Sequence, residues 1–376
     1  MFRDKCEIDF VAMQRVTNDN ANKMSRIFTA NTHTFYQNNV ISFIGINASG
    51  KTSILKLITF VCGMLNNQSI NSIPYDEVLD GLGKNDQVSF DIYFYTDNGN
   101  VNMLHTVVQQ ENSKFVITDE YLKSKPCSKA KNKKMICDFD GIQPAMQRNN
   151  NEMFLLDDVS IMVAFNKTTK DSLVYADMLR YTNINELSIS EDCPPEVIAF
   201  FDPSIEYLHI SQHQKDSDIR LKFFGEEELT LNRIVDLNRY LSSGTIKGIN
   251  TFVNAIKVFK TGGYLIVDEL ENHFNRELVS TLVRFYMDQR INPKGAVLIF
   301  STHYAELLDE FERSDNIYIV RNRNGISVEN LSALLERNDI KKSDAYQSGF
   351  LGGTTPMYDS YMDLKNSLIR SRKEDG

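Results

Sequence analysis

One short segment has the residue types and spacing of a phosphate-binding loop. It carries glycine at its first and sixth positions, then lysine and threonine, and its residues are Gly45, Ile46, Asn47, Ala48, Ser49, Gly50, Lys51 and Thr52. Glycines let the backbone curl so that its N–H groups point at phosphate oxygens. The apolar run 40–45 predicts a strand before the loop, and residues 51–60 predict a helix whose positive end faces the phosphates. The segment therefore predicts a nucleotide site in which Lys51 contacts the β- and γ-phosphates and the Thr52 hydroxyl binds Mg²⁺.

Two further apolar strand patterns end in residues that can act on a phosphate group. The pattern at 263–267 is followed by Asp268, which can hold Mg²⁺, and Glu269, which can orient and deprotonate an attacking water. The pattern at 296–300 is followed by Ser-Thr-His, and the imidazole of His303 can contact the γ-phosphate. His303 lies 34 residues after Glu269 (303 − 269), the span of one strand–helix–strand unit. This spacing favours a shared catalytic role over a capping acid and an isolated histidine.

A serine-rich segment at 241–245 precedes a helical stretch at about 246–259. Ser242 and the N–H groups at the start of that helix can bind a second anion. A plain N-terminal cap by Ser242 is the other interpretation, and the residues alone favour it.

The elements around these residues predict an α/β fold. Alternating strands at 87–96 and 101–110, with a third at 115–118, indicate an antiparallel lobe. Residues 150–240 read as mixed and mostly helical. The last part alternates strands with helices, as in a mostly parallel sheet, at 264–267, 276–289, 296–300, 304–311 and 317–320. We predict one domain over 1–340 with an inserted lobe at 97–225, followed by a helical tail over 341–376.

The order of these motifs resembles that of ABC-type ATPase heads, and most closely the soluble branch that includes the SMC, RecF and OLD-related ATPases. The resemblance rests on the phosphate loop, on Leu241-Ser242-Ser243-Gly244-Thr245, on Asp268-Glu269-Leu270-Glu271-Asn272-His273 and on Ser301-Thr302-His303. It implies a P-loop ATPase head with an antiparallel β lobe and a helical lobe, which binds ATP with Mg²⁺ and hydrolyses it as a head-to-head dimer. In such a dimer Ser242 and Gly244 would touch the γ-phosphate held by the other subunit, and residues 271–273 would line the interface.

The resemblance also implies a biological role, that of a regulatory ATPase in prokaryotic antiphage defence controlling a separately encoded effector. Ala48 departs from the family pattern, because a glycine usually follows the asparagine of the loop. The family's glutamine that links nucleotide to the inserted lobe has three candidates, Gln109, Gln110 and Gln143. A DNA-maintenance ATPase of the RecF or SMC type and a nucleotide-gated scaffold with little turnover are the alternative functions.

Composition limits the partners and the compartment. The net charge of −9 argues against a surface devoted to nucleic acid. A lysine-rich stretch at 122–135, which reads as an exposed loop, still allows nucleic acid as a partner. The five cysteines are odd in number and favour reduced thiols, hence a cytoplasmic location. No apolar run reaches the roughly 18 residues that a membrane span needs, so we expect no membrane partner.

Overall fold

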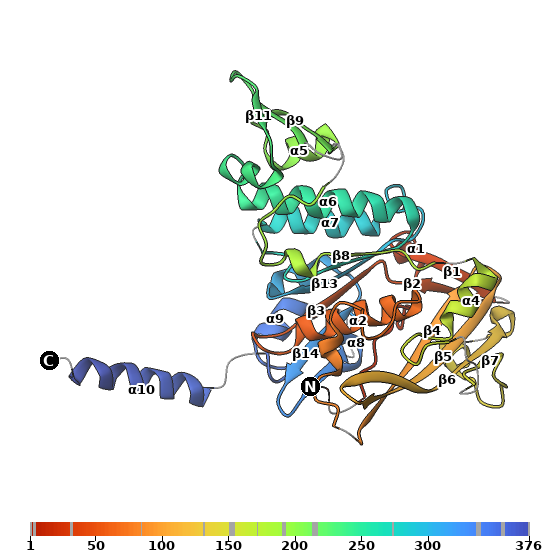
Figure 1. The fold of residues 1–376 in the computed structure, drawn as a ribbon. Coiled ribbons are helices and arrows are strands. Elements are labelled where there is room, and N and C mark those ends of the chain that lie inside the picture. The colour runs from red at the N-terminus through yellow and green to blue at the C-terminus, as the bar shows by residue number, and fades with distance from the viewer. Residues whose placement is uncertain are drawn as a thin grey trace.

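Helices and small sheets surround one central sheet in the computed structural model of the chain (Figure 1). The structure describes residues 2, 5–30, 33–83, 85–130, 132–149, 155–170, 172–189, 193–212, 217–272, 274–335, 340–354 and 358–374. The protein is therefore of the mixed α/β class, as the sequence predicts.

The central sheet has six strands in the order β15-β14-β3-β13-β12-β8. Their bounds are β3 Val40–Ile44, β8 Tyr175–Asp177, β12 Tyr264–Val267, β13 Val297–Thr302, β14 Ile317–Asn322 and β15 Ile326–Asn330. All neighbours run parallel except β14 and β15. Parallel strands are covered on both faces, which explains why β3 and β13 are buried along their whole length.

Helices cover the two faces of this sheet. Helix α2 (Lys51–Leu65) packs on one face, where Ile54 and Leu55 meet the inward side chain of Phe43. Helices α6 (Ser243–Thr261) and α7 (Arg276–Met287) pack on the other face. Successive strand residues point to opposite faces, so Ile41 belongs to the first layer and Val40 to the second. The strand and helix patterns predicted before and after the phosphate loop are confirmed.

An antiparallel sheet of order β4-β5-β6-β7 lies beside the C-terminal end of α2 (Figure 1). Its strands are β4 Gln87–Thr96, β5 Asn100–Glu111, β6 Lys114–Pro126 and β7 Met146–Gln147. Phe60 and Met64 of α2 pack against Val108 and Ile117 of the sheet, and this contact fixes the lobe to the central domain. The predicted hairpin and third strand are confirmed, although the third strand is much longer than expected.

The prediction of an exposed lysine loop at 122–135 is wrong. Strand β6 continues to Pro126, a 3₁₀ turn (η2) spans Cys127–Lys129, and α3 spans Lys133–Cys137. Lys125 donates to the carbonyl of Met135 at 2.7 Å and lies 4.3 Å from the ring of Phe139. Lys133 forms an ion pair with Asp9. Lys125 and Lys133 stabilise the local fold, because they donate hydrogen bonds to carbonyl and carboxylate oxygens. Lys131 lies outside the described residues.

The segment 150–240 is not mostly helical. It contains α4 (Met162–Thr169), α5 (Pro195–Phe201) and the short turns η3 (Leu179–Tyr181) and η4 (Ile234–Arg239). It also forms an antiparallel sheet of β9 (Ile205–Gln212), β10 (Ser217–Phe223) and β11 (Leu229–Leu231), which projects beyond α6 (Figure 1). Strand β8 lies within the predicted insert at 97–225 but belongs to the central sheet. The predicted insert is therefore interrupted by a strand of the main domain.

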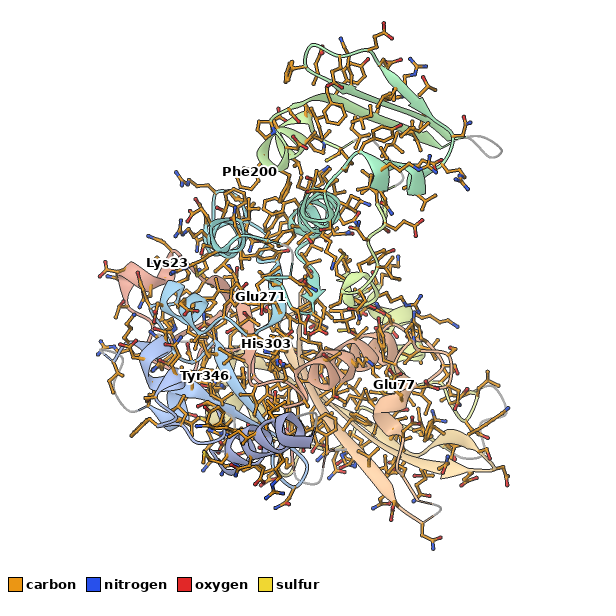
Figure 2. The ribbon with its side chains drawn as sticks, turned by 90° about the vertical axis from the view of Figure 1, so that its left-hand side faces the viewer. Lys23, Glu77, Phe200, Glu271, His303 and Tyr346 are labelled. Atoms are coloured by element: carbon orange, nitrogen blue, oxygen red, sulfur yellow. The ribbon has the colours of Figure 1, made fainter. Side chains whose placement is uncertain are left out.

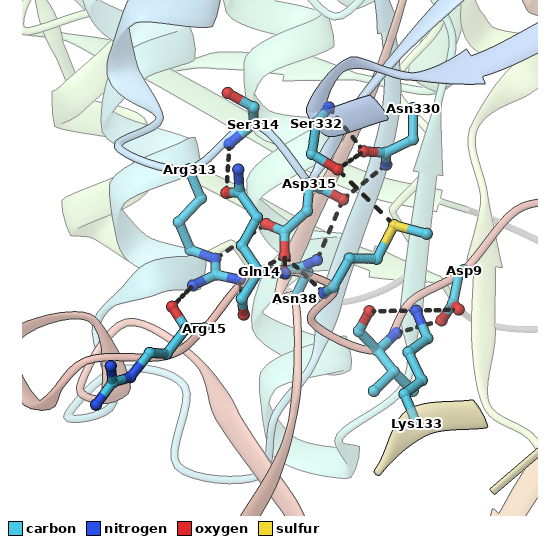
Figure 3. Close-up of polar contacts among 12 residues, drawn as sticks. Asp9, Gln14, Arg15, Asn38, Lys133, Arg313, Ser314, Asp315, Asn330 and Ser332 are labelled. Atoms are coloured by element: carbon cyan, nitrogen blue, oxygen red, sulfur yellow. Dashed lines mark hydrogen bonds and ion pairs between the residues drawn. The ribbon is translucent and has the colours of Figure 1, made fainter. Parts of the chain in front are cut away.

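The N-terminal segment is held against the start of β14 by a buried ion pair (Figure 3). Arg313 pairs with Asp315, whose side chain is fully buried. The same carboxylate accepts hydrogen bonds from the backbone N–H groups of Met13 at 2.7 Å and Gln14 at 2.9 Å. Arg313 in turn donates to the carbonyls of Gln14 at 2.8 Å and Arg15 at 3.1 Å. Each charge thus has several partners, which makes the burial of the pair tolerable.

Smaller elements complete the chain. They are α1 Asn18–Ala21, β1 Ser25–Ala30, β2 His33–Gln37, η1 Asp76–Leu79, η5 Ala305–Glu310, α8 Leu331–Leu334, α9 Lys342–Gln347 and α10 Tyr358–Glu374. Helix α10 forms about half of the predicted tail and extends away from the body (Figure 1). Among the described residues, no helix combines the length and the apolar character that crossing a bilayer requires.

Candidate functional site

The loop of residues 45–52, the phosphate loop, joins the end of β3 to the start of α2. A Cβ atom on Gly45 would lie 2.4 Å from both Ser49 Oγ and the carbonyl oxygen of Val320, so only glycine fits there. Gly50 has φ +99° and is the N-cap of α2, where no side chain caps the helix. The first N–H groups of α2 thus lack a side-chain acceptor, which is the arrangement that binds an anion.

Lys51 lies folded back over this loop with only 5% of its surface exposed. Its Nζ donates to the carbonyl oxygens of Gly45 at 2.8 Å and Ile46 at 3.2 Å. Burial lowers the pKa of Lys51 below its ordinary value, and the nearby carboxylates of Asp268 and Glu269 oppose that shift. The site thus holds a buried ammonium group that a phosphate can neutralise more fully than two carbonyls can.

Thr52 and Asp268, predicted as Mg²⁺ ligands, come together across the sheet. The Thr52 hydroxyl donates to Asp268 Oδ2 at 2.8 Å, and the Ser301 hydroxyl donates to Asp268 Oδ1 at 2.5 Å. A hydroxyl and a carboxylate oxygen are hard ligands that fit Mg²⁺, which takes its other ligands from water and substrate phosphates. This pair is therefore the candidate cation position; elsewhere in the described residues, no group of three or more His, Cys, Asp or Glu side chains is arranged to hold a metal ion.

Glu269 and His303 face each other beside Lys51. The imidazole Nε2 lies 3.5 Å from Glu269 Oε1, and Nδ1 lies 3.3 Å from Lys51 Nζ. An ammonium group can only donate, so Nδ1 accepts and the imidazole hydrogen resides on Nε2. Glu269 has φ +47°, a left-handed conformation that costs energy for any residue but glycine. Its N–H donates to Ser301 Oγ at 2.8 Å, and this bond helps to hold the strained turn in place.

These groups surround one open pocket of about 710 Å³, a volume suited to a nucleotide. Its lining consists of Asn47, Ala48, Ser49, Gly50, Lys51, Thr52, Ser53, Glu269, His303, Asn322, Gly325 and Ile326. Asn322 from the end of β14 donates to the carbonyl of Ala48 at 3.3 Å. The structure therefore brings the phosphate loop together with Glu269 and His303, as expected, and adds the β14–β15 turn, which the sequence did not indicate.

Ser242 and Gly244 do not line this pocket within the chain. The Ser242 hydroxyl accepts a hydrogen bond from the N–H of Thr245 at 3.1 Å, so Ser242 is the N-cap of α6. The simpler interpretation of this serine is confirmed, and the contact in trans stays a prediction. The candidate glutamines Gln109, Gln110 and Gln143 are also absent from the lining, and His273 lies outside the described residues.

Two residues of the site, Ser301 and Lys247, had no role in the sequence interpretation, and Glu271 was expected only at a dimer interface. Ser301 bonds Asp268 and could have been assigned from its place in the Ser-Thr-His motif. Glu271 accepts a hydrogen bond from the N–H of His303 at 2.5 Å. Lys247 of α6 donates to the carbonyl of Thr182 and lines a small cavity beside Glu269, and burial lowers its pKa. No local pattern marks Lys247, because only the packing of α6 on the sheet brings it to the site.

Comparison of the sequence with protein-family models and with curated proteins found no match.

Proposed function

We propose that this protein binds ATP with Mg²⁺ and hydrolyses it at the pocket formed by the phosphate loop, Asp268, Glu269 and His303. The observation that carries the proposal is the 2.8 Å bond between Thr52 and Asp268, residues that stand 216 positions apart (268 − 52). It places a hydroxyl and a carboxylate beside a helix start without a side-chain cap and beside a buried lysine. A cation, a phosphate-binding loop and a base in that arrangement are the parts that phosphoryl transfer to water needs.

In the proposed mechanism each group has one task. The amides of the phosphate loop and Lys51 bind the β- and γ-phosphates, and Lys51 exchanges its carbonyl partners for phosphate oxygens. Thr52 and Asp268 would hold Mg²⁺, which would supply positive charge against the β- and γ-phosphates. Glu269 accepts the proton of the attacking water, and His303 orients Glu269 through Nε2.

We further propose the ABC-type, OLD-related head as the family and a head-to-head dimer as the working form. Ser242 and Gly244 at the start of α6 would then complete the pocket of a second copy. Controlling a separate effector in antiphage defence is the biological role that this architecture suggests. It rests on the resemblance of four motifs. A nucleotide-gated scaffold is the competing function, and the turnover experiment below distinguishes the two.

Three variants test the proposed chemistry. Lys51→Ala should weaken ATP binding about tenfold to a hundredfold, because a charge-assisted bond to phosphate is lost. Glu269→Gln should retain ATP and lower turnover by about a hundredfold or more, since the amide cannot take a proton. Lys56→Ala is the matched control, because Lys56 lies on the same helix but pairs with Glu77 at 2.8 Å.

Phosphate release and the binding of labelled ATP are measured for the wild type and each variant. Equal ATP binding by the wild type and Lys51→Ala would refute the nucleotide site. Tight binding without turnover in the wild type would instead establish the scaffold.

Mixing two inactive variants tests the dimer. A Lys51→Ala subunit paired with a Ser242→Arg subunit keeps one complete site, so a random mixture should regain roughly a quarter of the wild-type sites. Each variant alone should be inactive. Mass spectrometry of the intact complexes verifies that mixed dimers form, and mixed dimers without recovered turnover would exclude the arrangement in trans.

A further inference from the structure

Glu271 is a buried acid of the site that lies outside the predicted chemistry. It lies two residues after Glu269, and only 7% of its surface is exposed. In Figure 2 it lies next to His303, where the helical layer of α6 and α7 meets the sheet. Its Oε1 accepts the N–H of His303 at 2.5 Å.

The second oxygen of Glu271 sets it apart from an ordinary structural acid. Oε2 is buried and has no hydrogen-bond partner in the structure. An unpaired buried acceptor destabilises the folded state, and more so when it is charged. Stability alone does not require the carboxylate, because the isosteric amide would keep the bond to the His303 N–H without burying a charge.

The position of Glu271 points to a role in orienting His303. Its bond to the His303 amide fixes the backbone from which the imidazole reaches between Lys51 and Glu269. The preceding turn is also tied to β13, because the N–H of Leu270 donates to the carbonyl of Ser301 at 3.1 Å. Glu271 is thus the point at which the turn after β12 controls the position of the histidine.

We propose that Glu271 is a positioning residue for hydrolysis. It fixes His303 through Oε1, and its Oε2 accepts a hydrogen-bond donor that the site gains when it closes over nucleotide. That donor is a water, a hydroxyl or an N–H group, because a carboxylate oxygen only accepts hydrogen bonds. The inference rests on the proposed ATP hydrolysis and adds a requirement for the charge of Glu271.

Glu271→Gln separates the two functions of the carboxylate. The amide oxygen still accepts the N–H of His303, but the amide nitrogen can only donate where Oε2 accepted. Turnover should fall about tenfold to a hundredfold, as is typical of residues that orient catalytic groups. The KM for ATP should change less than about twofold, because the phosphate loop is intact. Without nucleotide, the temperature of unfolding should stay the same or rise, because a buried carboxylate with an unpaired oxygen has been removed.

Glu120→Gln is the matched control. Glu120 is fully buried in β6 and has partners on both oxygens, namely Ser160 Oγ at 2.6 Å and the N–H of Ile161 at 2.8 Å. Its amide variant should unfold at a lower temperature and keep wild-type turnover. Wild-type turnover in Glu271→Gln would overturn the proposal. So would a fall in both turnover and unfolding temperature that Glu120→Gln reproduces.

The two levels of the proposal fail in different ways. Wild-type turnover no higher than that of Lys51→Ala would remove the proposed function itself. Clear wild-type turnover with an equally active Glu271→Gln would remove only the role of Glu271. The unfolding temperature, measured without nucleotide, tests how the unpaired oxygen of Glu271 affects stability, and it does not depend on turnover.

Discussion

Buried carboxylates occur in two regions of this molecule, and the two regions treat them differently. At the start of β14, Asp315 pairs with Arg313 and also accepts two backbone N–H groups of the N-terminal segment (Figure 3). At the end of β12, Glu271 is almost as deeply buried, yet one of its oxygens has no partner in the structure. Asp315 thus holds the fold together, whereas the second oxygen of Glu271 is the group that we propose to be paired in a closed state.

Backbone strain also differs between the pocket and the region around Asp315. Ala48 has φ +61° and Glu269 has φ +47°, and both residues line the pocket at the phosphate loop. The hydroxyl of Ser49, in the same loop, is buried and lacks a partner in the structure. No strained non-glycine residue falls at 9–15 or 313–315, the two segments joined by Asp315, all of which the structure describes. Two strained residues and one unpaired hydroxyl thus lie where a phosphate could supply new bonds, although other positions of the chain, such as Tyr75 and Asn316, carry one or the other feature as well.

The largest effect that this comparison predicts is on stability, at Asp315. Asp315→Ala should lower the free energy of unfolding by about 3–5 kcal/mol, because Arg313 then becomes an unpaired buried cation. Asp288→Ala is the matched control: Asp288 also pairs with an arginine two positions away, Arg290, but on the surface. Denaturant unfolding followed by circular dichroism measures both. A loss at Asp315 no larger than that at Asp288 would contradict the assignment of this region to the scaffold.

A smaller effect of opposite sign is expected in the strained loop. Ala48→Gly should raise the free energy of unfolding by up to about 1 kcal/mol, because relief of the left-handed alanine exceeds the added freedom of the unfolded chain. ATP affinity should not fall, since the loop amides are unchanged. Ala164→Gly, in the middle of α4, should instead destabilise the protein by about 1 kcal/mol. Destabilisation by Ala48→Gly would mean that the loop conformation is not strained.

Local patterns predicted the parts of the fold that lie around the site. The phosphate loop could be placed between a strand and a helix, because glycine spacing and the change from apolar run to helical pattern are local signals. The end of β12 was equally clear from its apolar run before Asp268. The geometry that joins these parts was not predictable, because the bond from Thr52 to Asp268 depends on the order of strands in the sheet.

Two predictions were wrong for physical reasons, namely the mostly helical segment at 150–240 and the exposed lysine loop at 122–135. In β9, a register irregularity opposite Lys222 and Phe223 interrupts the alternation, so the buried Ile205 and Leu208 stand at a helix-like spacing of three. Strand β10 did carry a usable signal, since its buried Ile219 and Leu221 alternate with charged residues. The lysines of β6 obscured a strand because their charge suggested a solvated loop, although Leu122 between them is buried.

The strand order of the central sheet has a consequence for folding during synthesis on the ribosome. Ile44 pairs with Thr302, a separation of 258 residues (302 − 44), whereas β4, β5 and β6 pair entirely within 87–126. Nearby segments find each other quickly, and distant ones slowly. The antiparallel lobe can therefore fold while synthesis continues, but β3 waits for β13 and β14 to emerge. Nascent chains expose the apolar strand next to the phosphate loop until then, and a chaperone that shields it would act during that interval.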